Sequence, residues 1–112
     1  MTDKVKVAFV LPTTLQKELK ERIVKDSYDL KGKSRWVSEA ITELLTTKSF
    51  PELVKINDIM KGFEKLESVV ISRELKKQMD DAVVDIRKVY PSIEGVQSRI
   101  LRTAIVQRLL RM

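Results

Sequence analysis

Two short sequence units occur twice in this 112-residue chain, in the same order each time. Residues 10–15 (VLPTTL) are echoed by residues 70–75 (VISREL), an offset of 60 (70 − 10). Residues 34–41 (SRWVSEAI) are echoed by residues 98–105 (SRILRTAI), an offset of 64 (98 − 34). Each copy has the pattern of one short strand followed by two helices. Because such a unit is too small to bury its own apolar face, the repeat predicts two halves that share one core.

Composition is typical of a small, helix-rich globular protein. Apolar residues make up 43% and charged residues 34%, and three glycines and three prolines are too few for an all-β fold with many turns. Cysteine and histidine are absent, which removes disulfides, zinc-finger ligands, thiol nucleophiles and the usual proton shuttle. No stretch has the length of a membrane span, and the N-terminus lacks a signal-peptide run. We therefore expect a cytoplasmic protein (host cytoplasm if the source is viral) with no metal or cofactor.

Basic residues are concentrated in the two copies. The net charge is +6 and the isoelectric point is about 9.7. Residues 1–48 carry ten basic and seven acidic side chains, residues 49–67 three and four, and residues 68–112 nine and five. A small basic domain of this kind commonly binds nucleic acid, although lysines on solvated helix faces raise the isoelectric point without any partner.

The first copy, residues 1–48, begins with an alternating strand that stops at Pro12. The more apolar face is predicted to lie inward and the other outward; these faces are Val5, Val7, Phe9 and Leu11, and Lys4, Lys6, Ala8 and Val10. Thr13 or Thr14 is predicted to cap a helix that ends near residue 27. After a turn to residue 33, a second helix is predicted to end near residue 47.

A connector, residues 49–65, separates the two copies. Pro51 could open a short helix that ends near Gly62, with its apolar residues along one side: Leu53, Ile56, Ile59 and Met60. The second copy, residues 66–112, is predicted to contain a strand at residues 66–71 and a helix at residues 72–89. Its last helix is predicted to start at residue 93 or 94, capped by Ser92 or by a residue near Gln97.

Each predicted strand needs a partner, because an isolated strand leaves a row of unpaired backbone groups. The matching strand of the other copy is the simplest one. Two like units related by a pseudo-two-fold axis would pair these strands antiparallel and back them with four helices. The predicted fold is therefore mainly α with one two-stranded antiparallel β-ribbon, arranged as an intramolecular pseudo-dimer.

This order of elements resembles the ribbon–helix–helix family of DNA-binding regulators. The resemblance rests on residues 5–15 and 32–41 of the first copy, and less closely on residues 69–75 and 97–101 of the second. A chain with both halves is similar to the tandem single-chain type found in conjugation proteins and in regulators of archaeal filamentous viruses. The resemblance implies double-stranded DNA as the partner, and transcription regulation as the function, most simply repression by blocking a promoter. The connector and the last helix could support self-association on DNA, or could pack in the core.

In that family the paired strands enter the major groove, where outward side chains read base edges. Carried over by position, these readers are Lys6, Ala8 and Val10 of the first strand and Ser68 and Val70 of the second, with Lys4 and Leu66 at the ribbon ends. Lys6 can donate to guanine and Ser68 can serve several bases, whereas the apolar members can only contact thymine methyl groups. The resemblance thus implies an asymmetric site with modest direct readout. The same residues would also suit a strand surface packed on another element.

The N-terminus of each copy's second helix is the other element that the resemblance carries over. Free backbone N–H groups and the helix dipole favour a phosphate there, which would position the ribbon without reading sequence. The residues so placed are Gly32, Lys33, Ser34 and Arg35 in the first copy, and Gln97, Ser98, Arg99 and Arg102 in the second. Ser34 is equally a candidate for a plain helix cap.

Other functions have less support from the residues. Trp36 lies in an apolar helical stripe, which favours core packing over base stacking. The acidic residues on helices fall on faces predicted to be solvated and have no histidine or cysteine beside them, so an enzyme is not indicated. Two alternatives stay open: an accessory protein that bends DNA for a relaxase or recombinase, and a protein-interaction module such as an antitoxin. An antitoxin would be expected to add a toxin-binding tail after its last helix.

Overall fold

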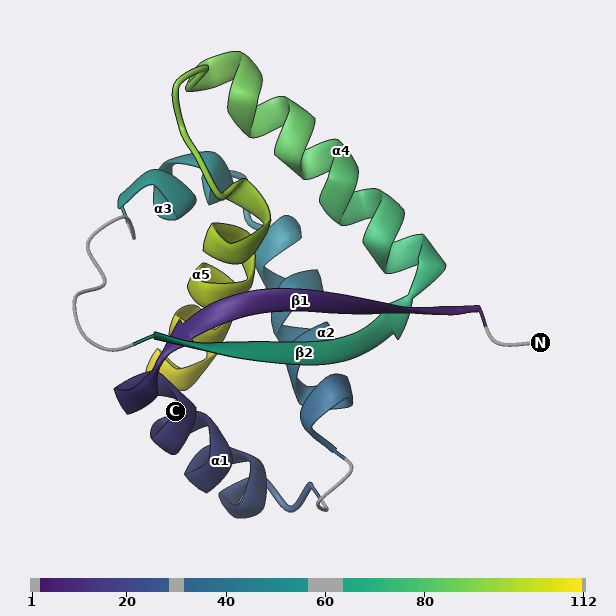
Figure 1. Ribbon diagram of the computed structural model, residues 1–112, viewed down its shortest axis with the longest axis vertical. Coiled ribbons are helices and arrows are strands. Elements are labelled where there is room, and N and C mark those ends of the chain that lie inside the picture. Colours follow the sequence, from purple (N-terminus) through teal and green to yellow (C-terminus); the bar gives the residue numbers. More distant parts are fainter. Residues whose placement is uncertain (1–2, 29–31, 57–63, 112) are drawn as a thin grey trace.

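The computed structural model describes residues 3–28, 32–56 and 64–111. Strands β1 (Lys4–Pro12) and β2 (Glu64–Ser72) form an antiparallel ribbon. The helices are α1 (Thr13–Lys25), α2 (Lys33–Leu45), α3 (Phe50–Ile56), α4 (Arg73–Val89) and α5 (Val96–Leu110). In Figure 1, α2 and α5 lie behind the ribbon, while α1 and α4 extend to opposite sides of it. Within the described residues, the prediction of a mainly helical chain with a two-stranded antiparallel sheet is confirmed.

The ribbon has one buried and one open face, as the alternation of the sequence predicts. Most inward apolar residues of the two strands are at most 2% exposed: Val7, Phe9, Leu11, Val69 and Ile71. Val5, also predicted to lie inward, is half-buried. The neighbouring positions on the other face are exposed or half-buried. A slip of one residue in either strand would turn its apolar set to solvent, so this burial fixes the register.

The inward face packs on a single hydrophobic cluster that draws residues from both halves of the chain. Trp36 and Ile41 of α2 and Ile100 and Ile105 of α5 are fully buried in it. α2 and α5 contact each other, α2 contacts β2, and α5 contacts β1. Each half's second helix therefore packs on the strand of the other half, and the core is completed only when both halves are present.

Trp36 packs in the core, as predicted, and also makes a polar contact. Its indole Nε1 donates to Oδ2 of Asp26 at 2.9 Å. This hydrogen bond holds the pKa of Asp26 below its ordinary value; desolvation opposes the shift, and the Arg22 guanidinium adds to it. The contact fixes the turn after α1 against the start of α2.

We expect this contact to make stability depend on pH in the acid range. Because the folded pKa of Asp26 is depressed, its contribution is fully present above the unfolded pKa and is lost as the pH falls through the folded pKa. Asp26→Asn keeps an acceptor for the indole but cannot titrate. Urea unfolding from neutral pH down through the carboxylate range should show a shallower loss of stability for Asp26→Asn than for the wild type. Equal slopes would contradict this account.

The starts of the first helix in each half differ. Pro12 occupies the N-cap of α1 with φ −56° and ψ 142°, and Thr13 is already helical. The predicted threonine cap is therefore wrong: proline fixes its own φ, and no side chain caps this helix. Ser72 stands at the same place before α4, and its Oγ accepts the N–H of Leu75 at 3.0 Å.

α5 starts later than predicted, at Val96. Gly95 precedes it in the left-handed region, with φ 61°. Glycine adopts this conformation without steric cost, and it lets the chain turn sharply into the helix. The predicted start at residue 93 or 94 and the Ser92 cap are therefore wrong, whereas the other prediction, a cap near Gln97, agrees with Gly95 at the N-cap.

The connector contains a short helix, α3, with Pro51 as its second residue. Val54 in this helix is fully buried, and Leu53, which was predicted to lie on its apolar side, is half-buried. The helix contacts α4 and α5. Ile59, Met60 and Gly62, which were predicted to continue it, lie outside the described residues.

Candidate nucleic-acid interface

The open face of the ribbon is formed by four cross-strand pairs. In order along β1 these are Lys4 with Ser72, Lys6 with Val70, Ala8 with Ser68, and Val10 with Leu66. All seven side chains predicted to read bases lie on this face. The pairing brings them together as one strip, with lysines at one end and aliphatic side chains at the other.

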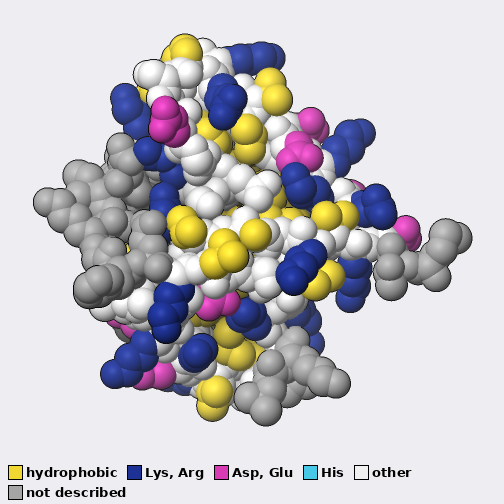
Figure 2. Space-filling view, in the orientation of Figure 1, with side chains coloured by type: hydrophobic (Ala, Val, Ile, Leu, Met, Phe, Trp, Pro, Cys, Tyr) yellow, Lys and Arg dark blue, Asp and Glu magenta, His cyan; other side chains and the backbone are white. Residues whose placement is uncertain are grey.

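Two aliphatic side chains, one on each side of the centre of this strip, are open to solvent: Leu66, which pairs with Val10, and Val70, which pairs with Lys6. Leu66 is 74% exposed and Val70 is 41% exposed. Figure 2 shows hydrophobic side chains gathered over β1 and β2, with lysines and arginines on both sides of them. Exposed apolar side chains on a strand ribbon, flanked by positive charge, suit a partner that offers both methyl groups and phosphates.

The edges of the ribbon are held by the second helix of the opposite half. Ser34 Oγ on α2 accepts the backbone N–H of Val70 at 3.0 Å, and Ser98 Oγ on α5 accepts that of Val10 at 3.4 Å. Gln97 Nε2 also donates to the carbonyl of Ala8 at 3.2 Å. Ser34 is not a helix cap, because Gly32 occupies the N-cap of α2. Both serines thus place a helix N-terminus directly beside the ribbon.

Removing these hydroxyls should cost stability unequally. We expect Ser34→Ala to lower the free energy of unfolding by about 1 kcal/mol, the usual net value of one hydrogen bond. Ser98→Ala should cost less, because its bond is longer. Urea unfolding with an unchanged m-value measures both effects, and Ser92→Ala, in the exposed turn before α5, is the control. A cost for Ser92→Ala equal to that for Ser34→Ala would argue against a specific edge contact.

The first residue of α2 is also tied to the ribbon. Lys33 Nζ lies 2.8 Å from Oε1 of Glu67, whose side chain is mostly buried at the edge of the inward face. Gln16 of α1 donates to the other oxygen of Glu67 at 2.6 Å. Neither partner of Glu67 was predicted from the sequence, although the alternation of the second strand places Glu67 on the same side as Val69 and Ile71. An inward carboxylate in an apolar strand signals a positively charged or hydrogen-bonding partner.

The remaining predicted phosphate contacts differ in their surroundings. Gly32 is buried. Arg35 is 72% exposed and lies over the Tyr28 ring at 4.3 Å, with Nε 3.9 Å from a carboxylate oxygen of Glu39. Arg99 and Arg102 on α5 are half-buried, and Arg99 donates to the carbonyl of Glu94 at 2.7 Å. Of the predicted arginines, Arg35 is therefore the most open to a ligand.

Sites of other kinds are not found in the part of the chain that the structure describes. No group of three or more acidic side chains is arranged to hold a metal ion there. None of the described helices is long and apolar enough to cross a membrane.

Comparison with known proteins gives no relative: no family model, no curated protein and no solved structure matches the chain.

Proposed function

We propose that the chain is a sequence-preferring, double-stranded DNA-binding transcription regulator built as a tandem ribbon–helix–helix protein. In this proposal the β1–β2 ribbon enters the major groove, and the N-termini of α2 and α5 contact phosphates on either side. The observation that carries it is the open ribbon face, flanked by those two helix starts at Ser34 and Ser98. A two-stranded ribbon fits the major groove, where base edges are distinguishable.

The register supports a pseudo-two-fold relation between the halves. Ala8 pairs with Ser68, which is its own counterpart at the repeat offset of 60. The pairs on either side are Lys6 with Val70 and Val10 with Leu66. Replacing each residue of one pair by its counterpart at the offset of 60 gives the other pair. The two hydrogen bonds from the strands to serines are related in the same way, because Ser34 corresponds to Ser98 at the offset of 64. These relations support the proposal of a dimer fused into one chain.

The side chains on the two sides of this axis differ, and so should the two halves of the DNA site. Lys4 and Lys6 lie toward one end and can donate to guanine O6 or N7, or to phosphate. Val10 and Leu66 lie toward the other end and can contact thymine methyl groups. We therefore propose a directional site rather than a perfect inverted repeat.

Selection of binding sites from random and genomic duplexes tests this function. The wild type should enrich one directional sequence, and clean inverted repeats within the footprint of one protomer would contradict the directional site. Lys6→Ala should weaken binding to the selected duplex by about tenfold, the scale of one lost charged contact. Lys77→Ala, which removes an exposed lysine of α4, is the matched control and should change affinity less than about twofold. Equal losses for the two variants, or an unchanged preference after Lys6→Ala and Val10→Ala, would contradict the proposal.

A further inference from the structure

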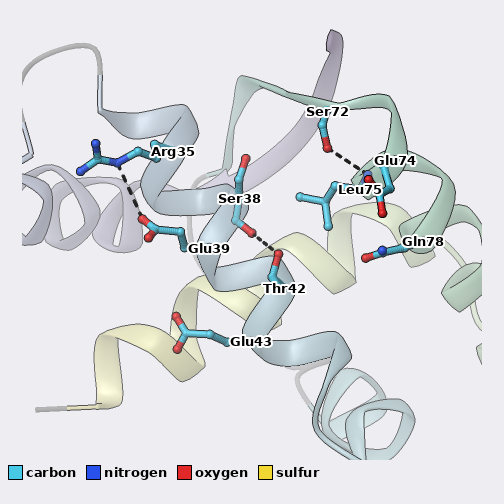
Figure 3. A pocket seen from close by; sticks show the side chains of 9 residues that line it. All are labelled: Arg35, Ser38, Glu39, Thr42, Glu43, Ser72, Glu74, Leu75 and Gln78. Carbon is cyan, nitrogen blue, oxygen red and sulfur yellow. Dashed lines mark hydrogen bonds and ion pairs between the residues drawn. The ribbon is translucent and has the colours of Figure 1, made fainter. Parts of the chain in front are cut away.

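A groove runs between α2 and α4, on the side of the molecule where these two helices come together. It consists of two hollows, of about 550 and 290 Å³, that share Thr42 and Gln78 in their walls. Figure 3 shows the larger one, with Glu39 and Glu43 on α2 and Glu74 and Gln78 on α4. We call this feature the α2–α4 groove.

The matching place in the other half lies between α1 and α5, and there an arginine takes part in the packing. Arg22 of α1 donates through Nη1 to the carbonyl of Leu109 at 3.0 Å and through Nη2 to the carbonyl of Arg111. Leu109 and Arg22 line a smaller hollow of about 220 Å³. A guanidinium thus closes the contact between the first helix of one half and the end of the second helix of the other.

At two positions of the α2–α4 groove, a small residue stands where the corresponding position of the other half has an arginine. At the offset of 60, Arg22 corresponds to Ala82, which lines the smaller hollow. At the offset of 64, the half-buried Arg102 corresponds to Ser38, which lines the larger one. The smaller hollow therefore lacks the guanidinium that Arg22 supplies at the matching hollow of the other half, whereas the larger hollow has Arg35 in its wall, next to Glu39.

Acidic side chains line the same groove. Asp81 and Asp85, one turn apart on α4, line the smaller hollow, and neither has an ion pair or side-chain hydrogen bond to any described residue. Glu74, at the larger hollow, also lacks such a partner among the described residues. The acidic side chains of α2 at the larger hollow are paired with arginines. The lining of the smaller hollow contains Asp81 and Asp85 and no basic side chain from the described part of the chain, so on a chain of net charge +6 this end of the groove favours a cation over DNA.

We infer that the α2–α4 groove is a docking site for a protein segment that carries arginine side chains. A guanidinium presents a planar fork of donors that matches carboxylates, and its aliphatic stem packs on apolar walls such as Leu45 and Phe50. The segment would supply from outside the guanidinium that Arg22 supplies within the other half. This inference is independent of the proposed DNA contact.

A capped pentapeptide with the sequence Leu-Arg-Leu-Arg-Leu, and its analogue with citrulline at both arginine positions, test the inference on the whole chain. In a ¹⁵N-edited NMR titration, the arginine peptide should shift the amide signals of Thr42, Gln78 and Asp85, and should bind at least about tenfold more tightly than the citrulline peptide. Equal affinity for the two peptides, or no shifts at the groove, would overturn the inference.

Substitutions of groove residues test the same inference. Replacing both Asp81 and Asp85 with asparagine should weaken the arginine peptide by about tenfold, whereas Asp80→Asn, beside the groove and paired with Lys76, should not. Ala82→Arg supplies a guanidinium from within and should abolish peptide binding. Because Ala82 is buried, the aspartate variants decide the outcome if Ala82→Arg fails to fold. Unchanged binding in the double asparagine variant would contradict the inference.

Discussion

Replacing Val70 with glutamate is expected to lower the affinity for duplex DNA by at least about 100-fold while leaving the chain folded. Like charges brought together at an interface cost several kcal/mol, and each 1.4 kcal/mol is a factor of about ten. Val70 lies on the open face of the ribbon, directly opposite Lys6. A glutamate there would face the phosphates and would also pair with Lys6, which removes a donor from the DNA.

The matched control makes the same chemical change on another surface. Val84 is 53% exposed on α4, away from the ribbon. Val84→Glu changes net charge and hydrophobicity as Val70→Glu does, but away from the proposed contact surface. We therefore expect it to weaken DNA binding only a few-fold, because it lowers the overall electrostatic attraction to the phosphates. Fluorescence anisotropy on the selected duplex, with circular dichroism for folding, measures both variants. Comparable losses would show that the ribbon is not the contact surface.

Replacing Arg108 with methionine is expected to lower the free energy of unfolding by about 2–3 kcal/mol, because hydrogen bonds to charged groups contribute about 1.5–3 kcal/mol each. Its side chain is only 19% exposed on α5. Nη1 donates to the carbonyl of Trp36 at 2.6 Å, Nη2 donates to the Tyr28 hydroxyl at 3.2 Å, and Nε lies 3.4 Å from Glu43. One guanidinium thereby joins the last helix to α2 and to the turn before it.

Arg87→Met is the control for this experiment, since Arg87 is an exposed residue near the end of α4. A surface substitution of this kind usually changes stability by less than about 0.5 kcal/mol. Chemical denaturation of both variants, read with the same m-value, gives the comparison. A loss for Arg108→Met no larger than that for Arg87→Met would mean that the guanidinium contacts are not important for stability.

Local sequence rules predicted most of the secondary structure and one face of the candidate site. Period-two alternation identified the buried and open faces of β1, because a half-buried strand shows its environment directly in its residues. Helical spacing placed Trp36 in the core for the same reason. The helix starts were predicted less well. Whether Thr13, Pro12 or Gly95 stands at a helix boundary depends on one backbone conformation, and several nearby residues suit each position.

Contacts between the two halves could not be predicted from local sequence patterns. Ser34 and Ser98 were predicted to contact phosphates, and Ser34 was also a candidate helix cap, since both lie near a predicted helix start. Their hydroxyls accept backbone N–H groups from strands of the opposite half. No local sequence pattern singles out Arg108 among the basic residues of its helix. Its partners lie 65 or more positions away in the sequence (108 − 43). Such contacts follow from how the halves pack, which depends on shape and not on the neighbouring residues.

Site-specific photocrosslinking is the most direct test of the central claim that the β1–β2 ribbon enters the major groove. Because the chain contains no cysteine, a label attached through one introduced cysteine marks a single position. Ser68→Cys places a photoreactive label at the centre of the open ribbon face, paired with Ala8. Val84→Cys places the same label on α4. On the selected duplex, the label at position 68 should crosslink to bases through the major groove at the centre of the footprint, and the label at position 84 should not. Base crosslinks from position 84 and none from position 68 would contradict insertion of the ribbon into DNA.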